Sequence, residues 1–360
     1  MRIGINALYL VPGGVGGTEI YLRSLVEALD ELDTPHTFIV YTNLETGPLG
    51  RNPAVLPVRG ASRPARILFE QVRLPAILRR HRIDALLNPG FTAPVFAPCP
   101  QVTVFHDLQH KRHPEYFRWF DLPFWNLFLA LSIRRSRRII TVSRTTLEDL
   151  RRFYGLAEER IDVVHHGVDP QFFEIGERHE DGGFLLCPST THPHKNHLRL
   201  LRVFSELRRH DANLRLVLTG VRGFAAKEVE RGVEDLGLRD CVDLLGWVSR
   251  ERLYEAYRCA RAFVYPSTFE GFGMPPLEAL AAGLPAALSD IEPIRSLCAG
   301  AARFFDPHSD ESLHAALEAV LFDQAERKRL RAAGPILASA FTWGRAAELT
   351  LRSIEASLRA

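Results

Sequence analysis

The sequence predicts an α/β protein with two doubly wound domains of similar size. At 360 residues the chain is too long for one compact core, so two domains of roughly 150–200 residues are expected. Short apolar runs typical of buried strands alternate with helical patterns throughout, as in parallel βαβ units. We place the domains at residues 1–170 and 171–340, and expect residues 341–360 to form a helix that could pack back on the first domain.

The first domain begins with a strand-like run at residues 2–8 and a glycine-rich loop at residues 13–17. Thr18 is the expected N-cap of the helix that follows. Helical patterns are expected at residues 65–80 and 145–153. The further strand candidates are Thr37–Thr42, Ala85–Asn88, Gln101–Phe105, Arg138–Val142 and Asp162–His165.

The second domain follows a polar, glycine-containing segment at residues 171–183 that has the composition of a linker. A final helical pattern comes after Phe341-Thr342-Trp343. The strand candidates of the second domain are Gly183–Cys187, Arg215–Thr219, Val242–Leu244, Ala262–Tyr265 and Ala286–Ser289.

Composition excludes several classes of protein. A net charge of +2 is too balanced for nucleic acid to be the main partner. Five scattered cysteines without a C-x-x-C pair predict neither a disulfide framework nor a zinc site, which fits a cytoplasmic location. The N-terminus has no signal-peptide pattern, and polar residues interrupt the longest apolar-rich stretch, residues 117–133. We therefore expect any membrane contact to be peripheral.

The strongest local signal is the segment Glu270-Gly-Phe-Gly-Met-Pro-Pro-Leu-Glu278, which follows a strand. Pro275 suits the first turn of a helix, placing Glu270 in the loop before it and Glu278 within about the first turn. Gly271 and Gly273 let backbone amides approach a ligand, and a helix N-terminus favours an anion. The pattern predicts two carboxylates that grip sugar hydroxyls while the amides hold a phosphate. The alternative is that Glu278 only interacts favourably with the helix dipole and that Glu270 is solvated.

Two further loops carry polar groups where strands end. Lys195 follows the strand at residues 183–187 and precedes a helix, where ammonium and helix dipole together suit a phosphate. His106 and Asp107 directly follow the strand at residues 101–105; the alternative there is a histidine whose hydrogen bonds are satisfied within the protein at a strand end. Gly16 and Gly17 lie in a loop too compact for a dinucleotide fingerprint, so an oxidoreductase is disfavoured.

Together these motifs resemble glycosyltransferase family four, the retaining nucleotide-sugar transferases of the GT-B fold. That resemblance covers nearly the whole chain and implies two Rossmann-like domains facing an interdomain cleft. It implies that Glu278 holds the ribose hydroxyls, that Glu270 lies against the donor sugar, and that Lys195 binds the diphosphate. The other residues it assigns to the donor are Gly271, Phe272, Gly273, Met274, Pro275, Thr190, Val248, Gly16 and Gly17.

The resemblance also assigns His106 to the donor sugar, with Asp107 fixing the tautomer of that histidine or helping the acceptor. Many members of the family have an arginine six residues before the lysine, but this chain has Ser189 there. Thr190, Thr191 or His194 could supply hydrogen bonds instead. No D-x-D pair follows a strand, so we expect no metal and no cofactor beyond the nucleotide-sugar substrate.

The expected reaction moves a hexose, with mannose from GDP-mannose as the leading donor, to a glycan or lipid-linked acceptor. Arginines alternate with apolar residues over residues 63–82, and residues 134–138 add a second basic cluster. Such a basic amphipathic surface could rest on anionic lipid at the inner face of the membrane, or be an ordinary solvated face.

The alternatives to a glycosyltransferase are an epimerase or phosphorylase on the same fold and a non-catalytic sugar-nucleotide binding protein.

Overall fold

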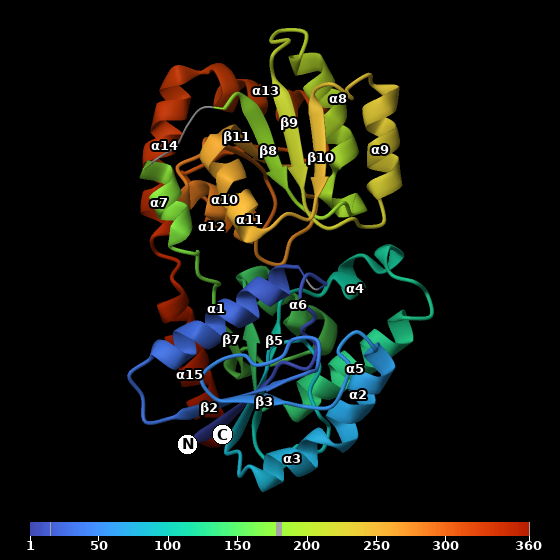
Figure 1. Ribbon diagram of the computed structural model, residues 1–360, viewed down its shortest axis with the longest axis vertical. Coiled ribbons are helices and arrows are strands. Elements are labelled where there is room, and N and C mark those ends of the chain that lie inside the picture. The colour runs from blue at the N-terminus through green and yellow to red at the C-terminus, as the bar shows by residue number, and fades with distance from the viewer. Residues whose placement is uncertain (15, 178–181, 360) are drawn as a thin grey trace. The chain divides into compact units, whose positions relative to one another are not determined.

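A computed structural model describes residues 1–14, 16–177 and 182–359, which form two compact units (Figure 1). The first contains residues up to Gly167 together with residues 342–359. The second is Val168–Phe341. Each unit has its own parallel sheet, as the alternating pattern of the sequence predicts.

The first unit is built on a seven-stranded parallel sheet with the order β3-β2-β1-β4-β5-β6-β7. The strand candidates are confirmed to within two residues at each end, but the three-residue edge strand β3 was not predicted. It begins with a proline and is too short to show an alternating pattern. The strands are β1 (Arg2–Asn6), β2 (Thr37–Thr42), β3 (Pro53–Val55), β4 (Ala85–Asn88), β5 (Gln101–Phe105), β6 (Arg138–Thr141) and β7 (Ile161–Val163).

Two helix predictions in this unit need correction. The helix α1 starts at Gly17 with Gly16 as its N-cap, so Thr18 lies inside the helix. The expected helix at residues 65–80 is two helices, because Pro75 lacks an amide hydrogen and its ring clashes with the preceding turn. The helices are α1 (Gly17–Glu31), α2 (Arg63–Val72), α3 (Leu74–Arg80), α4 (Gln109–Arg112), α5 (Leu122–Arg135), α6 (Arg144–Tyr154) and α15 (Trp343–Arg359), with 3₁₀ turns at Pro114–Tyr116 and Glu158–Arg160.

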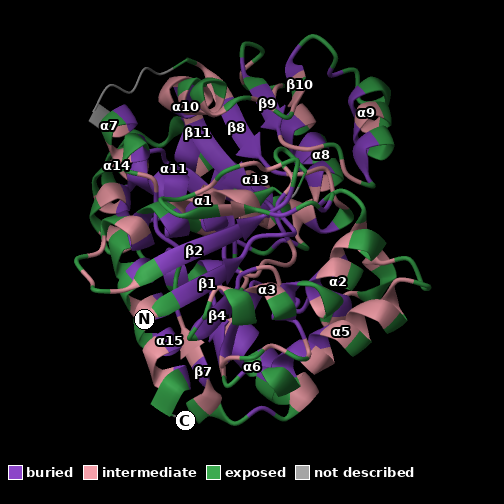
Figure 2. Cartoon of the chain, turned by 60° about the horizontal axis from the view of Figure 1, so that its bottom comes forward, coloured by how far each residue is buried: buried purple, intermediate pink, exposed green. Residues whose placement is uncertain are grey.

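The terminal helix α15 packs against α1 and against strands β4, β5 and β6 of the first unit. Its inward positions are small or apolar, such as Ala347 and Ile354, both fully buried. The inner strands β1, β2, β4, β5 and β6 are buried along nearly their whole length (Figure 2), as parallel strands covered on both faces must be. The edge strands β3 and β7 are partly exposed.

The second unit has a six-stranded parallel sheet with the order β10-β9-β8-β11-β12-β13. Its strands are β8 (Phe184–Pro188), β9 (Arg215–Thr219), β10 (Val242–Gly246), β11 (Ala260–Tyr265), β12 (Ala286–Ser289) and β13 (Arg303–Phe305). Its helices are α7 (Gln171–Glu177), α8 (His197–Leu207), α9 (Ala226–Asp235), α10 (Arg250–Cys259), α11 (Met274–Ala281), α12 (Ile294–Leu297), α13 (Asp310–Phe322) and α14 (Gln324–Ala338), with a 3₁₀ turn at Pro193–Lys195.

The predicted linker is wrong over its first half, because residues 171–177 form the helix α7. Phe172 and Ile175 of α7 are buried, and the Phe172 ring packs on the rings of Tyr254 and Tyr257 at centroid distances of 5.2 and 4.9 Å. Burial of these two side chains outweighs the weak helix propensity of the segment. Residues 178–181 of the predicted linker lie outside the described residues.

Among the helices of the described residues, none combines the length and apolar character needed to cross a bilayer.

Candidate functional site

The second sheet reverses its direction of growth between β8 and β11. In open parallel sheets, ligands bind beyond the carboxyl ends of the strands at such a switch point. The loop after β8 contains Lys195, and the loop after β11 contains Glu270. Thr268 N donates to the His194 carbonyl at 2.7 Å, which joins the two loops directly.

Lys195 and Glu270 form an ion pair, with 2.5 Å between Nζ and Oε1. Both side chains are nearly buried, with 12 and 11% of their surface exposed. The Tyr265 hydroxyl accepts a second hydrogen bond from Lys195 Nζ at 2.9 Å, and Ser267 Oγ donates to Glu270 Oε1 at 2.5 Å. A cation and a carboxylate are therefore held together at the switch point, where a phosphorylated sugar would need both.

The loop after Glu270 leads into the N-terminus of α11 as predicted. Gly273 is the N-cap with φ of 109°, a conformation that favours glycine. Pro275 occupies the first turn, where its missing amide hydrogen costs no helical hydrogen bond. Phe272 is buried, with its ring 6.5 Å from that of Phe341, so only its backbone is suited to a ligand. Gly271, Met274 and Pro275 are partly exposed.

Glu278 is the fifth residue of α11 and starts its second turn, which agrees with the predicted position at about the first turn. Its carboxylate is buried and accepts a hydrogen bond from Tyr257 Oη at 3.2 Å. Arg250 Nη1 lies 3.6 Å from Glu278 Oε1. Burial raises the pKa of Glu278, while the charge of Arg250 opposes that rise. The interpretation of Glu278 as a mere helix-dipole residue is therefore wrong.

Arg250 connects Glu278 to a network that the sequence analysis missed. It donates to Asp169 Oδ2 at 2.7 Å and to Tyr254 Oη at 2.9 Å. Burial would raise the pKa of Asp169, but hydrogen bonds from Arg250 and Tyr254 outweigh it and hold that pKa below its usual value. The signal available in the sequence was Ser249-Arg250 directly after the Gly246-Trp247-Val248 loop, where α10 begins.

Ser189 does not replace the cation that the family usually has there. Its hydroxyl is 2.9 Å from Nε2 of His197, and the residue is buried. Of the three suggested substitutes, Thr191 already accepts from Gly223 N at 2.8 Å and His194 is buried. Thr190 is partly exposed in the same loop.

Two close backbone approaches hold the β9 loop against the lysine loop. A Cβ added at Gly220, which has φ of 131°, would lie 2.4 Å from the Ser189 carbonyl oxygen. One added at Gly223 would lie 2.6 Å from the carbonyl oxygen of Thr191. These two positions therefore require glycine. Val248 lies partly exposed in the next loop along, after β10.

In the first unit, His106 follows β5 and is buried. Burial lowers the pKa of His106 to about 4, although a hydrogen bond to the Pro89 carbonyl opposes the shift. The ring is therefore neutral at neutral pH, and its Nε2 donates to that carbonyl at 3.0 Å. This bond sets the tautomer, a role that we had suggested for Asp107. The Asp107 carboxylate accepts instead from Gln109 N at 2.9 Å.

The first sheet has its own switch point, between β1 and β4. The loop after β1 contains Gly16, which has φ of 58°, and Gly17; a Cβ on either would meet no atom within 4 Å. The loop after β4 contains Gly90, where a Cβ would lie 2.2 Å from the Tyr9 ring. Gly16 and Gly17 thus lie at an open edge of the first unit.

The structure groups Lys195, Glu270 and Glu278 in the second unit, and His106, Asp107, Gly16 and Gly17 in the first. A site formed jointly by the two groups stays a prediction.

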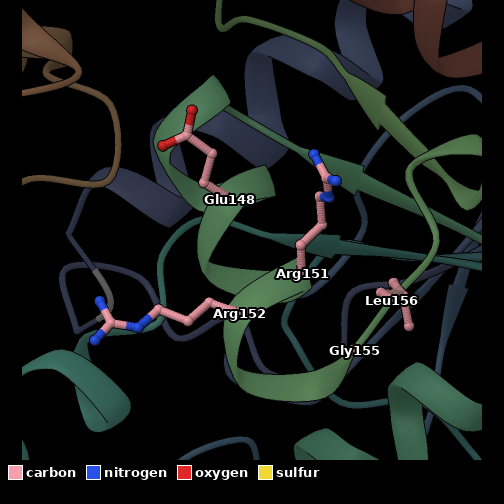
Figure 3. A pocket seen from close by; sticks show the side chains of 5 residues that line it. All are labelled: Glu148, Arg151, Arg152, Gly155 and Leu156. Atoms are coloured by element: carbon pink, nitrogen blue, oxygen red, sulfur yellow. The ribbon is translucent and has the colours of Figure 1, made fainter.

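A hollow of about 500 Å³ on the first unit is lined by α6 and the residues after it, including Arg151 and Arg152 (Figure 3). It includes none of the predicted donor residues. Within the described ranges, no group of three His, Cys, Asp or Glu side chains is arranged to hold a metal ion.

Comparison with known proteins bears on the identity of the chain. A family profile described as "Glycosyltransferase Family 4" matches residues 15–172, and one described as "Glycosyl transferases group 1" matches residues 168–336. The chain belongs to glycosyltransferase family four. Its two profiles meet at the boundary between the two units, near residue 168.

Curated relatives of this family-four chain include two O-antigen chain mannosyltransferases. The mannosyltransferase RfbU of Salmonella typhimurium is 28% identical over 61% of this chain and 60% of its own length. Mannosyltransferase B of Escherichia coli is 28% identical over 67% of this chain and 66% of its own length. The chain thus matches less than two thirds of either relative.

Solved structures show the same fold. Alr3699/HepE of Anabaena, in complex with UDP and glucose, superposes with a TM-score of 0.75 and 18% identity over 99% of both chains. WaaG, a glycosyltransferase involved in lipopolysaccharide biosynthesis, gives 0.73 and 18% identity over 98% of this chain and 99% of its own. The expected GT-B fold, with two parallel-sheet domains, is confirmed.

Proposed function

We propose that this protein is a retaining glycosyltransferase that moves a hexose from a nucleotide diphosphate sugar to a glycan or lipid-linked acceptor. The observation that carries the proposal is the Lys195–Glu270 pair at the switch point, beside the N-terminus of α11. The names of two relatives, both O-antigen chain mannosyltransferases, favour GDP-mannose as the donor and a polysaccharide as the product.

Transfer breaks the bond between the anomeric carbon and the diphosphate, leaving positive charge on the sugar and negative charge on the leaving group. In the proposed mechanism, Lys195 and the backbone amides at residues 271–275 stabilise the departing diphosphate. Glu270 orients the sugar, and His106 contributes from the first unit. Buried Glu278, held by Tyr257, binds the ribose hydroxyls.

The proposed route to retention is attack by the acceptor on the same face of the sugar from which the leaving group departs. None of these carboxylates is an obvious nucleophile on the opposite face. Trapping a covalent sugar adduct on any carboxylate would exclude it. No metal is assigned a step, because Lys195 and the α11 dipole supply positive charge to the leaving group. Transfer is therefore expected to continue in excess EDTA.

The decisive experiment is a thermal-shift screen of nucleotide sugars, followed by product analysis with the donor that binds. Lys195→Ala and Glu278→Ala should abolish the shift given by that donor, whereas Glu270→Ala should keep most of the shift and lower turnover. Lys227→Ala and Glu311→Ala remove exposed charges of the same unit and serve as matched controls. Normal donor binding by all three site variants would refute the site.

The same assay separates the alternatives. A changed free sugar released from the donor alone would indicate an epimerase, and a requirement for inorganic phosphate would indicate a phosphorylase. Donor binding without hydrolysis or transfer to any acceptor would indicate a sugar-nucleotide binding protein. The size of the thermal shift given by each nucleotide sugar measures donor preference, and UDP-sugars are the main alternative to GDP-mannose.

A further inference from the structure

Large apolar side chains are exposed together on one part of the first unit. Helix α5 is apolar on two sides: Leu129 and Ile133 face the core, while Leu127 is exposed. A helix that is apolar on both sides needs a second apolar environment for its outer side. The exposed members of this group, between 54 and 81% accessible, are Leu68 and Val72 of α2, Phe96, Trp119 and Phe120 before α5, and Leu127.

Contacts between side chains join these positions into one surface. Arg63 at the start of α2 bonds to Asp121 at 3.2 Å, and its guanidinium lies 4.2 Å from the Phe124 ring centroid. Gln71 of α2 accepts from Val95 N at 2.8 Å, beside Phe96. In Figures 1 and 2, α2 and α5 lie side by side accordingly. We call this the α2–α5 surface.

The surroundings of the α2–α5 surface are strongly basic. Residues 63–138 contain thirteen Arg and Lys but only five Asp and Glu, an excess of eight positive charges in a chain whose net charge is +2. Of the five acids, Glu70 is buried and Asp121 is paired with Arg63. The guanidinium of Arg135 lies 5.7 Å from the Phe96 ring centroid, so cation and apolar side chain are adjacent. The exposed cations of this range are Arg73, Arg79, Arg80, Arg82, Arg112, Arg118, Arg134, Arg135 and Arg137, of which Arg112 is paired with Asp149.

We propose that the α2–α5 surface inserts its apolar side chains into the interface of an anionic lipid bilayer. Tryptophan, phenylalanine and leucine favour the zone between head groups and acyl chains, and arginines around them bind the negative head groups. The charge excess selects an anionic bilayer over a second copy of the chain, because two such surfaces would repel each other. The inference rests on the proposed function in one respect: a lipid-linked acceptor would be presented at such a bilayer.

The test is flotation of the full chain with vesicles of phosphatidylcholine alone or with one third phosphatidylglycerol. Binding is expected only with the anionic lipid and should fall as salt is raised. Trp119→Ser/Phe120→Ser/Leu127→Ser should weaken the partition by about tenfold or more, since apolar contact adds to the charge attraction. Leu44→Ser/Leu236→Ser/Ile336→Ser removes exposed apolar side chains elsewhere and should bind as the unsubstituted chain does.

Insertion is read out directly from the fluorescence of Trp119. Brominated lipids should quench part of the emission, and Trp119→Phe should lose that part while still floating. No flotation with anionic vesicles, or equal flotation of the α2–α5 variant and unsubstituted chain, would overturn the proposal. Self-association removed by the same substitutions, without vesicle binding, would show that a second copy covers the surface.

Failure of this proposal and failure of the proposed function give different results. Donor thermal shifts are measured on the same variants without lipid, and they should be unchanged because no residue of the α2–α5 surface belongs to the donor site. Intact donor binding without flotation would reject the lipid surface alone. Flotation without any donor shift would reject the transferase site alone.

Discussion

At the scale of single residues, Lys195 is already neutralised by Glu270 at 2.5 Å. A donor diphosphate needs the same ammonium, so it must compete with the internal carboxylate for Lys195. The pair nevertheless has a use, because the displaced Glu270 would be released beside the sugar. Glu270 thus opposes binding of the leaving group while serving the transfer step.

Glu270→Gln is therefore expected to tighten binding of the free nucleoside diphosphate by about fivefold to tenfold while turnover falls. The amide keeps an oxygen that can accept from Ser267 but removes the charge that competes for Lys195. Calorimetry with GDP and UDP measures the affinity, and Glu311→Gln is the control. Weaker nucleotide binding by Glu270→Gln would contradict the competition.

At the scale of elements, Arg250 joins the first turn of α10 to Glu278 of α11 and to Asp169, which precedes α7. The guanidinium also lies over the rings of Phe172 and Tyr254, at 5.2 and 5.0 Å. Three elements of the second unit thus depend on one cation. Arg250 acts on the donor through Glu278 and is a positioning residue.

Arg250→Met should destabilise the second unit by about 3 kcal/mol, because it leaves the buried Glu278 carboxylate without its cation. The change keeps the apolar packing on Phe172 but removes the charge. Chemical denaturation measures the loss, and Arg250→Met/Glu278→Gln should recover part of it. A purely structural role predicts unchanged donor affinity in the folded variant; we expect that affinity to fall as well.

At the scale of the whole molecule, several histidines are buried in a neutral state. Burial lowers the pKa of His106, His110 and His197 to about 4, and that of His166 well below its usual value. Unfolding exposes these rings, and their pKa returns to about 6.5. The unfolded chain therefore binds more protons than the folded chain between these two values.

The free energy of unfolding should accordingly be retained above pH 6.5 and fall as the pH drops toward 4. Each of the three histidines with a pKa of about 4 contributes at most about 1.4 kcal/mol per pH unit in that window. Denaturation at pH 7, 6, 5 and 4 measures the slope, which His110→Gln should reduce. The exposed His308→Gln is the control, and an unchanged slope in His110→Gln would contradict the assignment.

Continuous apolar runs, which parallel strands buried on both faces produce, were enough to place eleven of the thirteen strands that the described residues form. Edge strands β3 and β13 have three residues each and show no such run. Helix α7 was missed for a related reason: a seven-residue segment is too short to form a stable helix alone, and it depends on packing against α10 and α11.

The sequence by itself determined the two-sheet fold and the local chemistry of each loop, because both depend on residues close together in the chain. The pairing of Lys195 with Glu270, 75 residues apart, appeared only when strand order made β8 and β11 neighbours. Tertiary structure likewise brought Asp169 to Arg250, 81 positions away. It also placed the Pro89 carbonyl where its hydrogen bond fixes the tautomer of His106. Such contacts follow from how parallel strands are ordered in a sheet, which no local pattern encodes.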